Sequence, residues 1–214
     1  MKLILYSALL CFAACNVKND TEVPQTALIV DQNLAEAYQD VQAAMTKKRT
    51  PIEFQGGEVA TDCARYMTLR SNRNLVEGVN NKIIKSEYVI CEALSILEAA
   101  KPAEVTPPAS LEGLYSQLDL TSFPSALRPQ LHGEIKTLKQ LSGLILESTP
   151  TRLSVDIHGI HNTFTLAAIA DVSGDGEGDW IVWLGQTLSD GNYHHYQTLV
   201  IAAPNTSGEL TGAY

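Results

Sequence analysis

Apolar positions recur every three or four residues over residues 30–101, which predicts helices. The first predicted helix begins after Asp31, whose side chain can cap it, and ends before Pro51. A second helix contains Cys63. The third, over residues 86–100, is apolar on most sides, which is typical of a helix at the centre of a bundle.

Prolines interrupt the chain after residue 101, and two shorter helical stripes follow. From residue 150 onward the apolar positions alternate, which predicts strands. The stripes comprise Leu111, Leu114, Tyr115 and Leu118, then Leu131, Ile135, Leu138 and either Ser142 or Ile145. The predicted strands cover residues 152–158, 163–170, 180–188 and 196–203.

Short connections between the predicted strands imply that consecutive strands pair antiparallel. We therefore expect an α+β fold, in which an N-terminal helical layer packs on a C-terminal four-stranded antiparallel meander with a calcium-loop hairpin. The helical part would cover residues 30–149 and the β part residues 150–214, with 30–214 forming one domain.

The N-terminus has the features of a secretory signal. Met1-Lys2 precedes an apolar run over residues 3–14, which is too short to span a bilayer because a spanning helix needs roughly 20 residues. The run ends in Phe12-Ala13-Ala14-Cys15, which resembles the lipobox of bacterial lipoproteins. A plain signal peptide that happens to contain Cys15 is the alternative.

The lipobox resemblance implies that residues 1–14 are removed and that Cys15 carries acyl chains such as palmitate, which anchor the protein in a membrane. Residues 15–29 would then form a lipidated tether. The residue after Cys15 is Asn16, whereas lipoproteins retained in the inner membrane of enterobacteria have Asp at this position. By analogy with enterobacterial sorting, the protein is expected at the outer membrane, on its periplasmic or cell-surface side.

Charge and cysteine content narrow the possibilities further. The chain has 15 Lys and Arg against 24 Asp and Glu, a net charge of −9, which argues against nucleic acid as a partner. Once Cys11 leaves with the signal and Cys15 carries lipid, Cys63 and Cys91 remain in an oxidising compartment. We predict a disulfide between them, with two free buried thiols as the alternative.

The acidic segment over residues 171–179 has oxygen side chains at alternate positions and glycines between them. Calcium takes six to eight oxygen ligands, and the glycines let the backbone curl around an ion. Val182 stands where an EF-hand has its bidentate Glu, so the segment is not an EF-hand. The expected ligands are the side chains of Asp171, Ser173, Asp175 and Asp179, and the backbone carbonyl of Glu177.

Residues 168–182 as a whole resemble the strand–loop–strand calcium hairpin of FG-GAP (integrin-propeller-like) repeats. The pattern occurs once, whereas a propeller needs several blades. The resemblance therefore implies a hairpin held by a structural Ca²⁺ rather than a propeller. An acidic solvated turn is the alternative.

Two further groups of residues have candidate functions. His158, His161, His194 and His195, with Asp156 nearby, can be combined into a zinc or hydrolytic site, or can be ordinary surface histidines. Trp180 and Trp183 lie on opposite faces of one strand. The exposed one would form a glycan- or protein-binding surface with Tyr193 and Tyr196, unless both tryptophans are packed.

The sequence contains no Gly-x-Ser-x-Gly, HExxH, P-loop or dinucleotide-binding motif. We therefore expect a non-enzymatic envelope lipoprotein whose calcium-stabilised domain binds a protein or glycan partner. Its task would be the assembly of an envelope machine or the inhibition of a periplasmic toxin or lytic enzyme. The alternative is a periplasmic metal-dependent hydrolase that uses the histidines.

Overall fold

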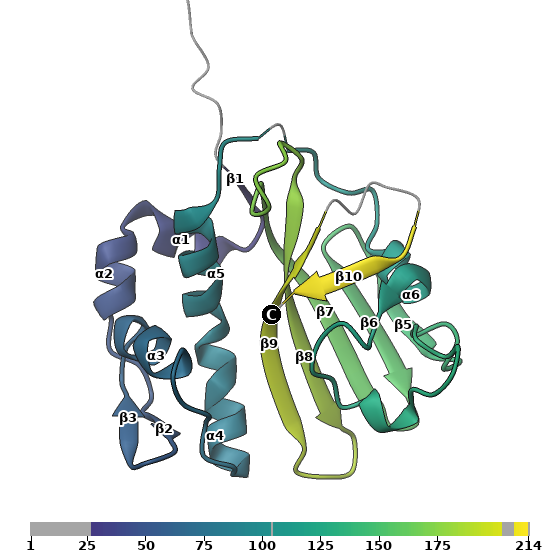
Figure 1. The fold of residues 1–214 in the computed structure, drawn as a ribbon, viewed down its shortest axis with the longest axis horizontal. Coiled ribbons are helices and arrows are strands. Elements are labelled where there is room, and N and C mark those ends of the chain that lie inside the picture. Colours follow the sequence, from purple (N-terminus) through teal and green to yellow (C-terminus); the bar gives the residue numbers. More distant parts are fainter. Residues whose placement is uncertain (1–26, 104, 203–207, 214) are drawn as a thin grey trace, which may run out of the picture.

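The computed structural model describes residues 27–103, 105–202 and 208–213 (Figure 1). The predicted signal peptide, Cys15 and most of the predicted tether lie outside these residues. Among the described helices, none has the length and hydropathy needed to cross a bilayer.

Four strands of the C-terminal half lie where alternation predicts strands, but they are part of a larger sheet. These four strands are β6 (Arg152–Ile157), β7 (Ile160–Ala170), β8 (Asp179–Leu188) and β9 (His194–Ile201). Consecutive strands pair antiparallel in the spatial order β9-β8-β7-β6. Their alternating apolar residues face a common interior, as period-two patterning requires. These interior residues include Leu153, Val155, Phe164, Val182 and Leu199.

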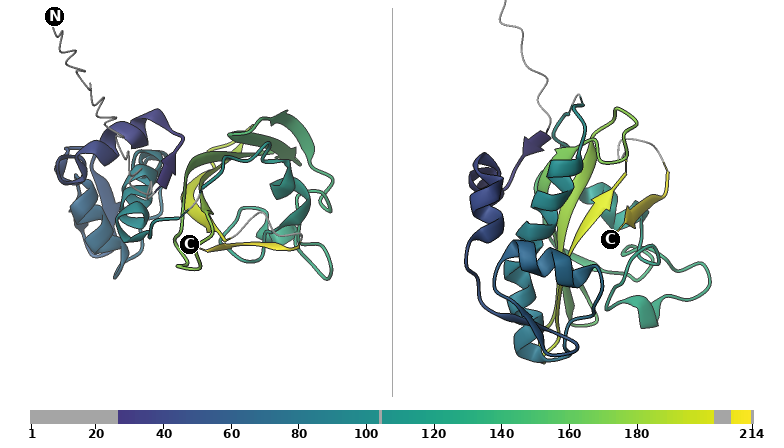
Figure 2. Two further views of the ribbon diagram at one scale, coloured as in Figure 1. Left: turned by 90° about the horizontal axis from the view of Figure 1, so that it is seen from above. Right: turned by 60° about the vertical axis from the view of Figure 1, so that its left-hand side comes forward.

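The predicted fold class is wrong, because the sheet has eight strands instead of four and curls into a half-barrel (Figure 2). β5 (Leu144–Ser148) pairs with β6, β1 (Ala27–Ile29) pairs with β7, and β10 (Leu210–Ala213) pairs with the end of β9. β4 (Leu118–Asp119) runs parallel to β10, so the sheet is mixed. Three of these added strands come from residues assigned to the tether or the helical part.

The helix expected over residues 131–145 does not form. Ser142 has a φ of 57°, and a Cβ on Gly143 would lie 2.5 Å from the Val155 side chain. A tight turn and a close approach of two backbones therefore take the place of a helical turn. Of the apolar residues that suggested a helical stripe, Leu131, Ile135 and Leu138 instead pack into the half-barrel from loops, and Ile145 packs there from β5. The helix α6 (Glu112–Gln117) and the 3₁₀ turn η2 (Arg128–Gln130) lie in the same part of the chain.

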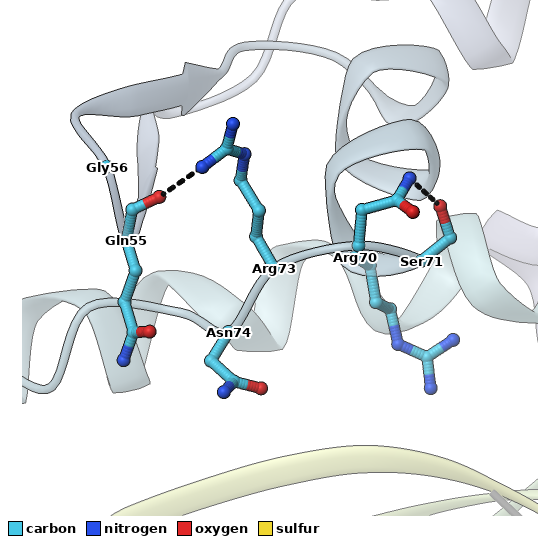
Figure 3. A pocket seen from close by; sticks show the side chains of 7 residues that line it. Gln55, Gly56, Arg70, Ser71, Arg73 and Asn74 are labelled. Atoms are coloured by element: carbon cyan, nitrogen blue, oxygen red, sulfur yellow. Dashed lines mark hydrogen bonds between the residues drawn. The ribbon is translucent and has the colours of Figure 1, made fainter.

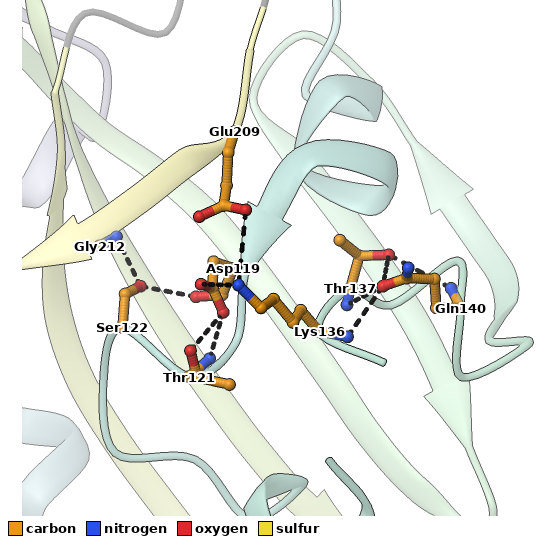
Figure 4. Close-up of polar contacts among 8 residues, drawn as sticks. All are labelled: Asp119, Thr121, Ser122, Lys136, Thr137, Gln140, Glu209 and Gly212. Atoms are coloured by element: carbon orange, nitrogen blue, oxygen red, sulfur yellow. Dashed lines mark hydrogen bonds and ion pairs between the residues drawn. The ribbon is translucent and has the colours of Figure 1, made fainter. Parts of the chain in front are cut away.

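A polar cluster holds β4 and β10 across the open side of the half-barrel (Figure 4). The Asp119 carboxylate accepts hydrogen bonds from the Thr121 backbone N–H at 2.7 Å and hydroxyl at 2.6 Å, and Lys136 Nζ lies 3.7 Å away. Burial opposes ionisation of Asp119, but these contacts outweigh it and lower its pKa. The Ser122 hydroxyl accepts the Gly212 N–H at 2.9 Å, which ties β10 to the same loop.

The helical layer lies on the outer face of one end of the sheet (Figure 1). The sheet side of this contact is formed by alanines of β7 and by Ile181 of β8. Because alanine side chains are small, the helices can lie close to the sheet. The layer contains α1 (Gln32–Gln39), α2 (Val41–Thr46), α3 (Cys63–Arg70), α4 (Val79–Ile84), η1 (Lys85–Glu87) and α5 (Val89–Ala99), with a hairpin of β2 (Ile52–Phe54) and β3 (Glu58–Ala60).

The predicted disulfide is present and joins Cys63 of α3 to Cys91 of α5. The first predicted helix is divided into α1 and α2 at Asp40, whose side chain accepts the Ala43 N–H and so caps a new helix. The α3 and α5 helices lie where the sequence predicted helices.

Candidate functional site

The outer face of the sheet carries rows of polar and aromatic side chains that run across the strands. Directly opposite residues of an antiparallel pair point to the same face, so the strand registers define these rows. The first row is Leu144, Asp156, His161, Thr187 and His194, on five successive strands. The second is Ser154, Thr163, Gly185 and Tyr196, and the third is Arg152, Thr165, Trp183 and Thr198.

The helical layer covers one end of this outer face and leaves the other accessible. At the covered end, Ala168 and Ile181 are buried beneath the helices. In the first two rows, His161, Thr163 and Tyr196 are half-buried and belong to none of the hydrophobic clusters. The accessible end is therefore a largely polar surface, which we call the open sheet face.

An aromatic platform stands on the open sheet face. The rings of His194 and Tyr196 are stacked, with centroids 6.5 Å apart and planes 12° from parallel. Gly185 lies beneath the tyrosine, because a Cβ there would be 3.2 Å from Tyr196 Cε1. The absence of a side chain at Gly185 thus allows the Tyr196 ring to lie close against the backbone of β8.

The two tryptophans separate as their odd spacing predicts. Trp180 is 5% exposed and belongs to the core inside the half-barrel. Trp183 lies on the outer face and packs partly against the helical layer, and its buried Nε1 has no hydrogen-bond partner among the described residues. Of the aromatic residues predicted to form a binding surface, Tyr196 lies on the outer face of the sheet and is half-buried.

A cavity of about 140 Å³ adjoins the platform, between the edge of β9 and α4. His194, His195 and Tyr196 line one side, and Lys82 and Lys85 line the other. Burial lowers the pKa of His195, and the charges of Lys85 and Lys82 lower it further, so its neutral form is favoured. Within the described chain, the buried Nδ1 of His194 has no hydrogen-bond partner.

The four histidines of the sheet do not share one site. His158 is in the β6–β7 turn, with φ 50° and its Nδ1 2.9 Å from Gln130 Oε1. His161 belongs to β7 rather than to that turn and faces Thr187, which in turn faces His194. Two strand spacings of about 4.8 Å separate these two histidines. His195 points to the opposite face of β9.

A metal-dependent hydrolase needs ligands that converge. In the described part of the chain, no three His, Cys, Asp or Glu side chains are grouped so that they could hold a metal ion. Asp156 is the cross-strand neighbour of His161, but its carboxylate accepts the Gly159 N–H at 3.2 Å, and no hydrogen bond joins it to the imidazole. The hydrolase alternative therefore gains little from this geometry.

The acidic loop connects β7 to β8 at the end of the sheet that the helices cover. Asp171 and Asp179 are 2% and 0% exposed, although both are carboxylates. Asp179 accepts the backbone N–H groups of Val172 at 2.9 Å and Ser173 at 2.8 Å. Such hydrogen bonds partly compensate the cost of burying a carboxylate.

The remainder of the loop curls around Asp171. Its two carboxylate oxygens accept the N–H groups of Gly174 and Gly176, and both glycines have positive φ angles, 83° and 92°. Asp175, by contrast, is exposed and accepts the Glu177 N–H at 2.8 Å. Each carboxylate oxygen has a second lone pair, so these bonds leave acceptor capacity for a cation.

The side-chain donors of the loop are oxygens, which a hard cation prefers, but among the described residues no three acidic, His or Cys side chains are grouped so that they could hold a metal ion. Lys101 is the neighbouring positive charge. Its backbone N–H donates to the Asp171 backbone carbonyl at 2.8 Å, and its side-chain Nζ would lie 2.5 Å from a Cβ at Gly174. The loop is thereby joined to the end of α5.

No family model matches the chain, and comparisons with curated proteins and with solved structures find no match. The candidate site consequently rests on its geometry alone. The sequence identified His194 and Tyr196 but missed Thr163 and Gly185. Knowledge of the strand register would have found both, because Gly185 faces Tyr196 across β8 and β9, and Thr163 faces Gly185 across β7 and β8.

Proposed function

We propose that the chain is a non-enzymatic envelope lipoprotein that binds a glycan on its open sheet face. The observation that carries this proposal is the Tyr196 ring, which lies close over Gly185 and is stacked beside His194. A flat aromatic ring among hydroxyl and imidazole groups suits a sugar, which offers an apolar ring face and hydrogen-bonding hydroxyls. A protein partner usually requires a larger desolvated apolar centre.

Hydrogen-bonding groups surround the platform on two sides. Thr163 and Thr187 supply hydroxyls, and Asp156 and His161 extend the first row away from it. Each of these side chains is half-buried, so it is held in place while it stays accessible. Polar groups in fixed positions give orientation and specificity to a carbohydrate site.

Envelope location is the part of the proposal that the N-terminal sequence supports. The lipobox-like segment predicts acylation of Cys15 and attachment to the outer membrane. The Cys63–Cys91 disulfide is compatible with an oxidising compartment. In this setting calcium is plentiful enough for the loop at residues 171–179 to bind it with the weak affinity of extracellular sites, ~10⁻⁴–10⁻³ M.

The test is cosedimentation of the purified protein with isolated peptidoglycan sacculi. Wild-type protein should sediment with the sacculi, and Tyr196→Ala should reduce the bound fraction at least fivefold. Tyr38→Ala serves as the control, because Tyr38 is a half-buried tyrosine of the helical layer, remote from the open sheet face in the fold. Circular dichroism would establish that both variants are folded.

Equal sedimentation of wild type and Tyr196→Ala would refute the role of the platform, and no sedimentation of wild type would refute peptidoglycan as the ligand. Metal analysis of the same preparation addresses the hydrolase. Zinc that is retained through purification and lost in both His161→Ala and His194→Ala would favour that alternative over glycan binding.

A further inference from the structure

A second, separate cavity lies on the disulfide-linked part of the helical layer. It has a volume of about 380 Å³, within the range of small-molecule sites, and lies between the β2–β3 turn and the loop after α3 (Figure 3). Two of its seven lining residues are arginines and none is acidic, in a chain whose net charge is −9. The lining comprises Gln55, Gly56, Arg70, Ser71, Asn72, Arg73 and Asn74.

The two arginines differ in their partners. Arg70 Nε lies 3.3 Å from the buried carboxylate of Glu92, which Arg70 shares with Lys85. Arg73 donates one hydrogen bond, from Nη1 to the Gln55 carbonyl at 3.3 Å, and no described carboxylate lies within ion-pair distance of it. A guanidinium has five N–H donors, so most of those of Arg73 are available to a ligand.

The backbone holds Arg73 in a fixed place. Its N–H donates to the Leu69 carbonyl at 2.9 Å, and the carbonyl of the next residue, Asn74, accepts the Gln55 N–H at 2.9 Å. Gly56 has a φ of 89°, and a Cβ there would lie 2.6 Å from Arg73 Nη1. The turn therefore requires glycine both for its conformation and to make room for the guanidinium.

Amide groups add further unused donors at the rim. The side chains of Gln55 and Asn74 make no hydrogen bond within the described structure. Figure 3 shows them extending, one from the β2–β3 turn and one from the loop after α3, on the side opposite the Arg73 guanidinium. Asn72 is already engaged, because its amide donates to the Ser71 hydroxyl at 2.8 Å. The cavity thus offers the Arg73 guanidinium as its principal donor group and lacks a competing carboxylate, whereas the free amides face its other side.

We propose that this cavity binds the oxyanion of a small polar ligand, a carboxylate or a phosphate, with Arg73 as the principal contact. Guanidinium matches the planar or tetrahedral oxygens of such groups through two parallel N–H bonds. The site is independent of the open sheet face, because their lining residues do not overlap.

The test is calorimetric titration of the purified protein with two ligands, inorganic phosphate and glucuronate. Arg73→Gln should weaken binding of the preferred ligand about tenfold or more, as expected for loss of a charge-assisted hydrogen bond. Arg73→Lys should retain only part of the affinity. Arg65→Gln is the matched control, because Arg65 is also an α3-region arginine but pairs with Glu58 and does not line the cavity.

Preference for phosphate would identify the phosphate group as the recognised oxyanion, and preference for glucuronate the carboxylate of a sugar acid. Either result, combined with loss in Arg73→Gln alone, supports the proposal. It is overturned if neither ligand binds the wild type, if Arg73→Gln binds as well as the wild type, or if Arg65→Gln weakens binding equally. Arg73→Gln should still sediment with sacculi if the open sheet face binds glycan. Failure of the oxyanion site can therefore be distinguished from failure of the glycan-binding proposal.

Discussion

The carboxylate of Glu92, in α5, accepts the backbone N–H of Thr198, in β9, at 3.0 Å. Along this edge β9 has little strand pairing, because β10 pairs only with Val200 and Ile201. An unpaired edge N–H that is buried needs another acceptor. The helix side chain therefore takes the place of a neighbouring strand, which explains how a helical layer can lie against the sheet at this point.

The same carboxylate is the centre of a buried charged cluster. Its Oε1 accepts the hydroxyl of Tyr66 at 2.7 Å, contacts Lys85 Nζ and lies 3.3 Å from Arg70 Nε. Burial opposes ionisation of Glu92, but the two cations and the hydrogen bonds outweigh it and lower its pKa. One side chain thus joins α3, η1, α5 and β9.

Replacing Glu92 with Gln should destabilise the protein by about 3–5 kcal/mol, because two buried or half-buried cations lose their counter-charge. The measurement is urea unfolding at pH 7. Glu36→Gln, an exposed change on α1, should cost less than about 0.5 kcal/mol. A loss below about 1 kcal/mol for Glu92→Gln would show that the cluster contributes little to stability.

His195 should make stability depend on pH in the weakly acidic range. Burial, with the charges of Lys85 and Lys82, lowers its pKa in the folded state, whereas the unfolded chain has a value near 6.5. As pH falls below ~6.5 the unfolded chain binds a proton that the folded chain does not. Stability conferred by the neutral imidazole is therefore present above that pH and is lost as pH falls toward the folded-state pKa.

The corresponding experiment is urea unfolding at a series of pH values from 7.5 to 5.5. The wild type should lose up to about 1.4 kcal/mol per pH unit through this group, and His195→Gln should have a shallower slope. His132→Gln, at an exposed position, should leave the slope unchanged. Identical slopes for wild type and His195→Gln would contradict the assignment.

The parts of the fold that the sequence predicted are those with a local signal. Alternation over residues 152–201 predicted β6 to β9, and the cysteine content predicted the Cys63–Cys91 bond. The strands it missed are short or have no alternation: β4 has two residues, and β5 reads Leu-Ile-Leu before a bulge. They form because neighbouring strands offer partners, which is a tertiary effect.

In the candidate site, too, residues with a local signal were predicted and residues placed by tertiary pairing were missed. Tyr196 was identified as an aromatic candidate, but its support by Gly185 depends on the register of β8 against β9. Arg73 had no distinguishing neighbour in the sequence, since Gln55 and Gly56 lie on a different hairpin and meet it only in the fold. Pairings of this kind are set by long-range register and loop placement, on which local patterns carry no information.

Reducing the disulfide should destabilise the protein by ~3–4 kcal/mol, because it closes a loop with a sequence separation of 28 and so restricts the unfolded chain. Urea unfolding with and without reductant measures this difference. A variant with Cys63→Ser and Cys91→Ser should resemble the reduced protein and should not respond to reductant. If the reduced and oxidised proteins unfold at the same urea concentration, the bond has no role in stability.

Calcium should raise the unfolding temperature through the loop at residues 171–179. With a dissociation constant of ~10⁻⁴ M, 10 mM calcium would add up to about 2.7 kcal/mol by mass action, and each kcal/mol corresponds to roughly 2–4 °C for a domain of this size. Thermal unfolding in excess calcium and in excess chelator should therefore differ by several degrees. Asp175→Ala should abolish the difference, whereas Asp190→Ala, in the exposed β8–β9 turn, should preserve it. An equal midpoint in both conditions would mean that Asp171 and Asp179 serve only to close the turn through its backbone N–H groups.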